Sequence, residues 1–334
     1  MIRIIAAAPI AVALAIASVT AFAAETTNAF VGRWALTLPD GTAGWLGVTE
    51  EDGILDASML WRGGSVVAVA NLYIVRETLH LTRVSNIEWD DDGRIERIRT
   101  EDIAATVSDD TLTLIRYARQ PDGNAAVAER FTGKRIPPLP PKPDLSRVKY
   151  GKPINLIKDD TLDGWTPIAP EWRNCWSVKN GELVNEPVQA EGEEEVRCAN
   201  LRTVKEFEDF NITLEVNVGK GQNSGVYLRG IYEVQVEDTY GREVDSHNMG
   251  AIYSRIAPRV AAEKPPGEWQ TLDITLLDRH VTVKLNGTTI IDNEPLLGCT
   301  GGALWADEFR PGPIYLQGDH GPIKCRNILL TPIL

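Results

Sequence analysis

Short segments rich in β-branched and aromatic residues recur along most of the chain, and tight-turn residues separate them. In the first half, such segments are found at 33–38, 44–49, 66–73, 78–84, 95–98, 111–117 and 129–132. Turn formers such as Pro39-Asp40-Gly41 and Asp91-Asp92-Gly93 lie between them. Helical periodicity is scarce. Since consecutive short strands with tight turns favour antiparallel sheets, the sequence predicts an all-β protein.

A proline-rich segment divides the chain in two. Residues 136–144 contain five prolines, a composition that favours an extended, semi-rigid spacer. The chain is also longer than one usual domain. We therefore predict a small antiparallel β-barrel or β-sandwich at 25–135, a linker at 136–149 and a second β domain at 150–334.

The first 23 residues have the pattern of an export signal. Arg3 precedes an apolar run from Ile4 to Phe22, and Ala21-Phe22-Ala23 fits a cleavage site. A membrane anchor is the alternative, but the run barely reaches the roughly 18–20 residues of a span and lacks a basic stop. We expect removal of residues 1–23 and a periplasmic or secreted protein with no membrane span in its mature form.

The net charge and the cysteine content indicate which partners and which cellular compartment to expect. The formal net charge of −13 repels phosphate backbones, so nucleic acid is not expected as a partner. In an oxidising compartment an even number of cysteines suggests disulfides. Proximity in sequence favours Cys175–Cys198 and Cys299–Cys325, with four buried free thiols as the alternative.

The second half also shows the strand and turn pattern. Two hairpins are predicted around Asn180-Gly181 and Asn286-Gly287, which are favoured in two-residue β-turns. Further strands are expected at 210–218, 224–228, 232–236, 269–277, 280–285 and 314–316. This strand content predicts a two-sheet sandwich.

Eight motifs lie in order along this half. They are Phe207–Phe210, Asn223–Gly230, Tyr232–Asp238, Met249–Tyr253, Pro266–Gln270, Leu285–Gly287, Leu316–Pro322 and Arg326–Ile328. Over about residues 153–334, this order resembles the 3-keto-disaccharide hydrolase domain family. The resemblance implies a concanavalin A-like jelly-roll β-sandwich, related to lectins and retaining β-glucanases, and activity on glycosides oxidised to a ketone at sugar C3. Residues 25–135 lie outside the resemblance.

Two positions depart from the family pattern. Cys325 stands where the family usually has an aromatic residue before Arg-Asn-Ile. Gly318 separates Gln317 from Asp319, where many members run directly from Gln to Asp. We expect the first change to bear on the core or on a disulfide, and the second on the presentation of His320.

Strand alternation identifies a candidate catalytic face. Glu233, Gln235 and Glu237 share one face of the extended segment Tyr232–Asp238, and Tyr232, Val234 and Val236 occupy the other face. The Glu-x-Gln-x-Glu spacing resembles the catalytic strand of retaining β-glucanases. Those enzymes need carboxyls about 5–5.5 Å apart. Four flat-strand steps span roughly 13 Å, so a bulge or strong twist would be required.

Cleavage beside a ketone requires different groups. A base must remove the proton at C2, and a donor must assist the C3 oxygen. His320 suits the base, because its ordinary pKa lies near neutrality, and Gly318 and Gly321 allow the bends that present it. The predicted catalytic residues are His320, Glu233, Glu237 and Asp319, and the predicted substrate-binding residues are Arg229, Gln235, Gln317, Tyr253 and Trp269.

No cofactor is firmly indicated. A divalent metal ion could polarise the ketone, with Glu233, Gln235 and His320 as candidate ligands. The sequence thus favours an exported enzyme that cleaves (3-keto-)glycosides, with a carbohydrate as its partner. The alternatives are a carbohydrate-binding module without catalysis, a conventional retaining glucanase and an envelope-interaction protein.

Overall fold

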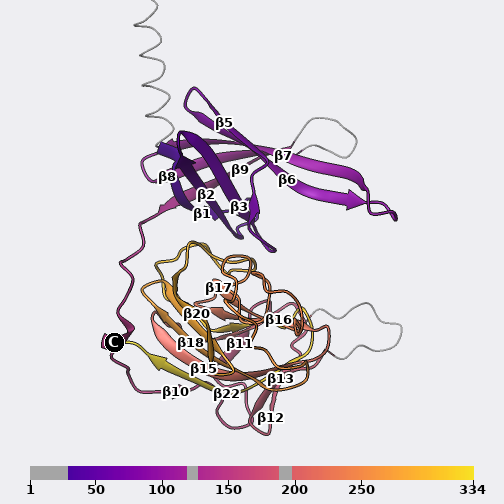
Figure 1. Cartoon of the computed structure of the whole chain (residues 1–334), viewed down its shortest axis with the longest axis vertical. Coiled ribbons are helices and arrows are strands. Elements are labelled where there is room, and N and C mark those ends of the chain that lie inside the picture. Colours follow the sequence, from indigo (N-terminus) through magenta and orange to yellow (C-terminus); the bar gives the residue numbers. More distant parts are fainter. Residues whose placement is uncertain (1–28, 119–126, 188–197) are drawn as a thin grey trace, which may run out of the picture. The chain divides into compact units, whose positions relative to one another are not determined.

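The computed structural model describes residues 29–118, 127–187 and 198–334, which form two compact units (Figure 1). The predicted export signal at 1–23 lies outside these residues. Regular structure in the described residues is almost entirely β-strand, which confirms the predicted class. No helix within them is long and apolar enough to cross a membrane.

The first unit is one nine-stranded antiparallel sheet. Its strand order is β4-β3-β2-β1-β9-β8-β7-β6-β5, so β1 pairs with β9, and β4 and β5 are the two edge strands. This is a meander rolled toward a barrel, as predicted. The strands are β1 (Gly32–Thr37), β2 (Ala43–Glu51), β3 (Ile54–Trp61), β4 (Val67–Ala68), β5 (Asn71–Val75), β6 (Thr78–Trp89), β7 (Ile95–Ser108), β8 (Thr111–Ala118) and β9 (Val127–Ile136).

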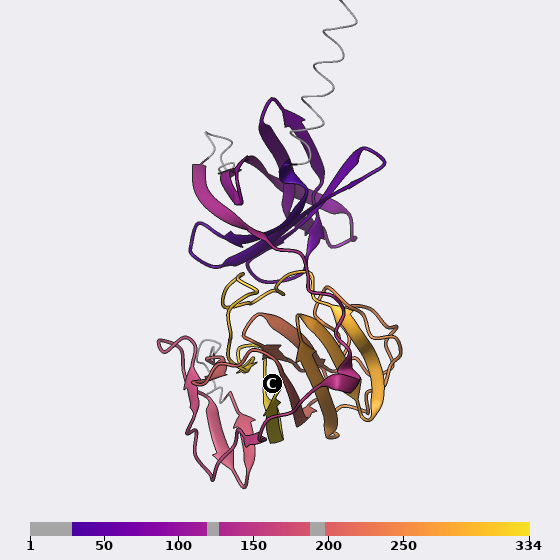
Figure 2. The same cartoon turned by 90° about the vertical axis from the view of Figure 1, so that its left-hand side faces the viewer.

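The second unit is built from two antiparallel sheets. Strands β15, β18, β19 and β20 lie side by side in the larger sheet (Figure 2, salmon to gold). That sheet contains β12 (Trp176–Lys179), β13 (Glu182–Asn185), β22 (Ile323–Pro332), β15 (Phe210–Val218), β18 (Gln270–Leu277), β19 (His280–Leu285) and β20 (Thr288–Pro295), with β10 (Ile154–Asn155) paired to β22. The smaller sheet is ordered β11 (Trp165–Pro167), β14 (Leu201–Thr203), β21 (Tyr315–Leu316), β16 (Asn223–Leu228) and β17 (Tyr232–Glu237).

Alternation along the strands creates the core of this unit. In β15, Phe210, Ile212, Leu214 and Val216 are buried while the residues between them are half-buried. In β17, Val234 and Val236 are fully buried as well. Because successive strand side chains point to opposite faces, each sheet offers one apolar face to the core. The unit is therefore a jelly-roll β-sandwich, as predicted.

Both predicted hairpins are confirmed, and their turn residues explain why. Asn180 and Gly181 join β12 to β13 with φ of 53° and 75°. Asn286 and Gly287 join β19 to β20 with φ of 49° and 82°. Two consecutive residues with positive φ define the turn that matches strand twist, and Asn-Gly adopts it at low cost.

The proline-rich segment is held along the second unit. Arg279 Nη2 donates to the Pro138 carbonyl and Asn293 Nδ2 donates to the Pro143 carbonyl, each at 2.9 Å. The 3₁₀-helix η1 (Leu145–Arg147) follows, and Tyr150 then forms a β-bridge with Ile333. The segment is therefore anchored to the second unit rather than a bare spacer.

One of the two favoured disulfides is present. Cys175 and Cys198 are bonded, with their Cα atoms 5.6 Å apart. Pairing of Cys299 with Cys325 is wrong, since both are free and buried. Cys325 lies within β22, between β13 and β15, whereas Cys299 lies in the chain after β20. Nearness in sequence therefore did not bring the second pair together.

Candidate active site

The smaller sheet of the second unit has one polar face. In the β16–β17 ladder Tyr227 lies opposite Glu233, Gly225 opposite Gln235 and Asn223 opposite Glu237. Tyr315 of β21 lies opposite Tyr227 on the other side of β16. Directly opposed residues of antiparallel strands share a face. Glu233, Gln235 and Glu237 thus face the same way, as alternation predicted.

A pocket opens on this face. Within residues 137–334 it is lined by Asn200, Asn223, Tyr227, Glu233, Gln235, Tyr253, Gly301, Gly302, Tyr315, Gln317, Asp319 and His320. Five of the residues predicted from sequence as catalytic or substrate-binding groups beside Glu233 are among them: Gln235, Gln317, Tyr253, Asp319 and His320. The fold therefore gathers groups from β16, β17 and β21 and from the loop after β21.

Glu233 is the carboxyl deepest in this pocket, and its side chain is only 4% exposed. Its backbone N–H donates to Thr300 Oγ1 at 2.9 Å, which fixes the start of β17. Its side chain lies over Gly225, where a Cβ atom would come within 2.4 Å of Glu233 Oε1. The absence of a side chain at position 225 creates the space that Glu233 occupies.

The environment of Glu233 favours its protonated form. Burial raises its pKa to about 8, and the charge of Asp319 adds to this, while Tyr227 and His320 oppose it. The Tyr227 hydroxyl also donates to the Gly301 carbonyl at 2.8 Å, and burial remains the dominant influence on Glu233. At neutral pH Glu233 can therefore donate a proton.

His320 and Asp319 form a hydrogen-bonded pair at the same pocket. His320 Nδ1 lies 2.8 Å from Asp319 Oδ1. This bond, more than any other cause, raises the pKa of His320, and the charge of Glu233 acts in the same direction where that carboxyl is ionised. When Nδ1 carries the proton of this bond, Nε2 of the neutral ring is the free, basic nitrogen. The pair is thus arranged as a base with an orienting carboxylate.

Neutral hydrogen-bond acceptors surround these ionisable groups. Gln235 Oε1, Gln317 Oε1 and Asn223 Oδ1 have no hydrogen-bond partner, although all three side chains line the pocket. The Gln235 side chain is 1% exposed and that of Gln317 is 7% exposed. Buried polar atoms normally have partners, so these oxygens are candidates to accept hydrogen bonds from a bound molecule.

Three residues predicted from sequence do not line the pocket. Glu237 is held by Gln235 Nε2 at 2.9 Å and by Arg242 Nη1 at 3.0 Å. Arg229 is 1% exposed and donates to the carbonyls of Glu308 and Arg310. Trp269 immediately precedes β18 of the larger sheet, and the Arg326 guanidinium stacks on its ring. The positions of Glu237, Arg229 and Trp269 give no support to their predicted roles in catalysis or sugar binding.

Several pocket residues were not predicted from the sequence. Tyr227 and Tyr315 stack with their ring centroids 4.0 Å apart beneath Glu233, and Asn200 Nδ2 donates to the Tyr315 hydroxyl at 3.2 Å. Tyr227 shares the alternating face of Gly225 and Asn223, which could have identified it once β16 was placed beside β17. Asn200 has no comparable signal, because it lies just before the short strand β14.

The candidate metal ligands meet at the pocket but do not form a recognisable centre. Glu233, Gln235 and His320 all line it. Across the described residues, no group of three or more His, Cys, Asp and Glu side chains is arranged to hold a metal ion. A divalent ion at these residues stays a prediction.

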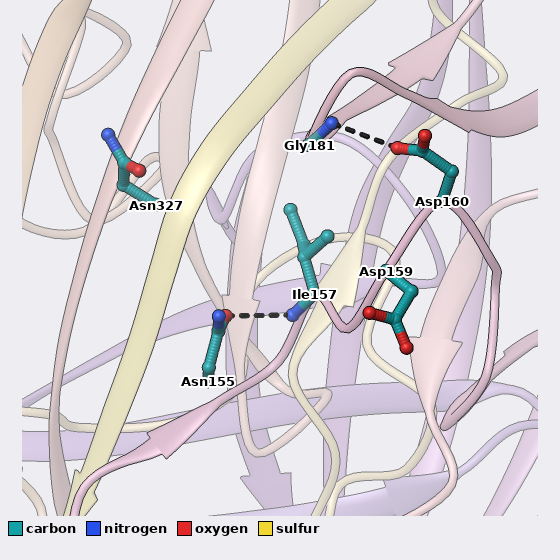
Figure 3. A pocket seen from close by; sticks show the side chains of 6 residues that line it. All are labelled: Asn155, Ile157, Asp159, Asp160, Gly181 and Asn327. Atoms are coloured by element: carbon teal, nitrogen blue, oxygen red, sulfur yellow. Dashed lines mark hydrogen bonds between the residues drawn. The ribbon is translucent and has the colours of Figure 1, made fainter.

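A second pocket of this unit has a structural explanation (Figure 3). Its residues are Asn155, Ile157, Asp159, Asp160, Gly181 and Asn327. Asn155 Oδ1 accepts from the N–H of Ile157, and Asp160 Oδ1 accepts from the N–H of Gly181 in the β12–β13 turn, each at 3.1 Å. These bonds stabilise turns. The pocket on the smaller sheet, which contains Glu233 and the His320–Asp319 pair, is therefore the better candidate of the two for an active site.

The fold and this pocket define the class of protein. The second unit is a jelly-roll sandwich whose polar face combines a buried acid, a histidine–carboxylate pair and unpartnered acceptors. Residues 152–331 match the family model of the 3-keto-alpha-glucoside-1,2-lyase-like domain. The chain belongs to this family, which gives it a carbohydrate-active role.

Solved structures with similar chains have related descriptions. A "putative glycosyl hydrolase" from Parabacteroides distasonis ATCC 8503 is 28% identical, covers 59% of this chain and 93% of its own, and has a TM-score of 0.42. A second from the same organism is 25% identical, with coverages of 54% and 98% and a TM-score of 0.40. A non-specific endo-beta-1,3(4)-glucanase is 13% identical, with coverages of 59% and 92% and a TM-score of 0.34. No curated protein matches the chain.

Proposed function

We propose that this protein is an exported enzyme that cleaves the glycosidic bond of 3-keto-glycosides by elimination across C1 and C2. The observation that carries the proposal is the buried Glu233, whose raised pKa favours its protonated form, in the same pocket as the hydrogen-bonded His320–Asp319 pair. An elimination needs one base and one acid at the same time, and these two groups supply them.

The keto group makes this chemistry accessible to ordinary side chains. A carbonyl at C3 acidifies the C–H bond at C2, because the carbanion formed there is delocalised onto the C3 oxygen. His320 Nε2 takes the C2 proton. Asp319 stabilises the resulting imidazolium through the bond to Nδ1 at 2.8 Å. This step requires a base near neutrality and no nucleophile.

Loss of the C1 substituent completes the elimination. The electron pair at C2 forms the C1=C2 double bond as the C1–O bond breaks, and Glu233 gives its proton to the departing oxygen. The products are an alcohol and an unsaturated 3-keto sugar, to which water can add. His320 ends protonated and Glu233 ionised, so one proton returns through solvent. Gln235, Gln317 and Asn223 would accept hydrogen bonds from the sugar hydroxyls.

The geometry gives little support to a retaining glucanase mechanism. The β16–β17 ladder runs from Asn223–Glu237 to Leu228–Tyr232 without a register shift, so the required bulge is missing from this strand. Four strand steps then separate Glu233 and Glu237 by roughly 13 Å at Cα. Retaining enzymes need carboxyls about 5–5.5 Å apart.

Isotope substitution tests the elimination directly. With a 3-keto-glucoside carrying deuterium at C2, we expect several-fold slower turnover, because the C2–H bond breaks in the reaction. His320→Gln and Glu233→Gln should each reduce turnover by about 10²–10⁴-fold, the usual contribution of a general acid or base. Full activity in both variants would contradict the site assignment.

Export is a separate part of the proposal and rests on residues 1–23. The mass of the protein purified from the periplasm or medium should correspond to a chain that starts after Ala23. Full-length protein that remains in the cytoplasm would contradict export and leave the catalytic proposal unaffected.

A further inference from the structure

The loop that follows β21 carries Asp319 and His320. We call residues 318–321 the 318–321 loop. It lies between β21 and β22, which belong to different sheets of the sandwich. His320 is half-exposed, so packing of its own ring does little to fix it. Its position depends on how the backbone of the loop is held.

One buried asparagine holds the loop through its carbonyls. Asn185, at the end of β13, is fully buried. Its Nδ2 donates to the Gly318 carbonyl at 2.9 Å and to the Gly321 carbonyl at 2.8 Å. A single amide group therefore links the first and last residues of the loop and fixes its width.

A second asparagine holds the loop through its N–H groups. Asn200 precedes β14, and its Oδ1 accepts from the backbone N–H of Gly318 at 2.7 Å and of Asp319 at 3.2 Å. Its Nδ2 donates to the Tyr315 hydroxyl at 3.2 Å. Asn200 thus connects Asp319 to the tyrosine stack beneath Glu233.

Gly318 makes this close approach feasible. A Cβ atom at position 318 would come within 2.7 Å of both the Ala199 carbonyl oxygen and Trp176 Nε1. A glycine there lets the loop lie directly against residues 199 and 200. The glycine between Gln317 and Asp319 is therefore matched to the hydrogen bonds from Asn200.

We propose that Asn185 and Asn200 are positioning residues that clamp the 318–321 loop from two sides and so set the geometry of the Asp319–His320 pair. The proposal rests on the proposed function for its catalytic consequence. Neither asparagine needs to touch the reacting atoms. A misplacement of about 1 Å can reduce turnover roughly 10²-fold, so the expected effect is on kcat more than on KM.

The same substitution at the two positions should have opposite results. Asn200→Asp keeps the oxygen that accepts from Gly318 and Asp319 and loses only the bond donated to the Tyr315 hydroxyl, so we expect it to retain more of kcat than Asn200→Ala, which should lose about 10–100-fold. Asn185→Asp loses both donated bonds and places a carboxylate beside two carbonyls. It should therefore lose as much kcat as Asn185→Ala. Asn217→Ala is the matched control. Asn217 lies in the larger sheet, and its Nδ2 donates to the Gly267 carbonyl.

A second readout does not depend on turnover. The titration of His320, followed by NMR and assigned with His320→Gln, reports on its contact with Asp319. The charged groups that act on His320 are Asp319 and Glu233. In Asn200→Ala and Asn185→Ala, the pKa of His320 should fall toward its ordinary value, and Asn217→Ala should leave it unchanged. The titration of His320 tests the clamp even if no 3-keto-glycoside is cleaved.

The outcomes separate the clamp from a general loss of stability. Support requires folded variants by circular dichroism, a reduced kcat or a lowered His320 pKa in the alanine variants, and rescue by Asn200→Asp. Equal losses in both aspartate variants, or an unchanged His320 pKa in both alanine variants, would overturn the clamp. If one Asn185 variant fails to fold, the comparison of Asn200→Ala with Asn200→Asp still tests the clamp.

Discussion

Burial determines which chemistry Glu233 can carry out. A carboxyl on a solvated strand face would be ionised at neutral pH and could act as a base or nucleophile, but not as a proton donor. Glu233 instead lies over Gly225 with its side chain 4% exposed, and burial raises its pKa to about 8. The same strand therefore presents a proton donor at position 233 and an ionic partner of Arg242 at position 237.

The pH dependence of turnover should reflect two groups. Activity requires neutral His320 and protonated Glu233. We expect kcat/KM to rise as pH passes the raised pKa of His320 and to fall as pH passes about 8, where Glu233 ionises. In Glu233→Gln the residual activity should lose its alkaline decrease. A decrease that persists in this variant would assign it to another group.

The same group should make folding stability depend on pH. Since the folded state binds the Glu233 proton more tightly than the unfolded state, stability falls as pH rises toward about 8. His320, whose pKa is also raised, acts in the same direction. Between pH 6 and 8, Glu233→Gln should reduce the slope of unfolding free energy by up to about 1.4 kcal/mol per pH unit, measured by urea titration. An identical slope would show that Glu233 is ionised in the folded protein.

Gly225 should be required for the position of Glu233. A Cβ at position 225 meets Glu233 Oε1 at 2.4 Å and its Cγ and Cδ at 3.0 Å, so Gly225→Ala must displace the carboxyl. We expect a loss of kcat of about 10-fold or more, because proton donation depends on placement. Gly219→Ala is the control, since its Cβ has only ordinary contact with Gln222. Unchanged activity in Gly225→Ala would contradict the role of this space.

At the scale of elements, the Cys175–Cys198 disulfide supports the segment that reaches the site. Arg173 forms a β-bridge with Cys198, and Asn200 follows two residues later. The bond spans 23 residues, so the chain-entropy estimate of its contribution is roughly 3 kcal/mol. The paired variant Cys175→Ser/Cys198→Ser should therefore have a lower unfolding free energy. An unchanged unfolding free energy would contradict this contribution.

The remaining cysteines should behave as buried thiols. Burial raises the pKa of both Cys299 and Cys325 to about 12, so neither forms an appreciable thiolate near neutrality. A thiol reagent should label neither residue in the folded protein and both after unfolding without reductant. Rapid labelling of the native protein would contradict this placement.

Some elements could be predicted from sequence and others could not. Asn180-Gly181 and Asn286-Gly287 specify their hairpins through local backbone preference, so the sequence was sufficient there. Strand β3 was missed because Asp56 and Ser58 interrupt its apolar pattern. Most of β22 was missed as well, since it carries Lys324 and Arg326 and its pairing with β15 shifts register.

Residues of the candidate site could be predicted from the sequence only where strand alternation gives the direction of a side chain. The shared face of Glu233, Gln235 and Glu237 follows from a period of two. Arg229 was misplaced because it follows the end of β16 with φ of 54°, where alternation no longer gives the direction of a side chain. Asn185 and Asn200 reach the 318–321 loop through contacts between residues more than 100 positions apart, which no local pattern contains.

At the scale of the whole molecule, the chain joins a family domain to a second β unit. The match at residues 152–331 leaves the nine-stranded sheet outside it. Every group in the proposed elimination belongs to residues 137–334, so the chemistry is assigned to that unit. The family, the sandwich and the pocket together support a carbohydrate substrate, and in the proposed mechanism the acid and the base act on a substrate activated by a ketone.

The most direct test of this account is product formation by the full-length protein from a 3-keto-glucoside and from its unoxidised parent under the same conditions. The account predicts that the alcohol is released only from the keto form, because the parent lacks an acidified C2–H bond. Each reaction is run with and without chelator, and loss of turnover with chelator would add a metal ion to the site. Cleavage of the parent at a similar rate, or of neither compound, would contradict the elimination.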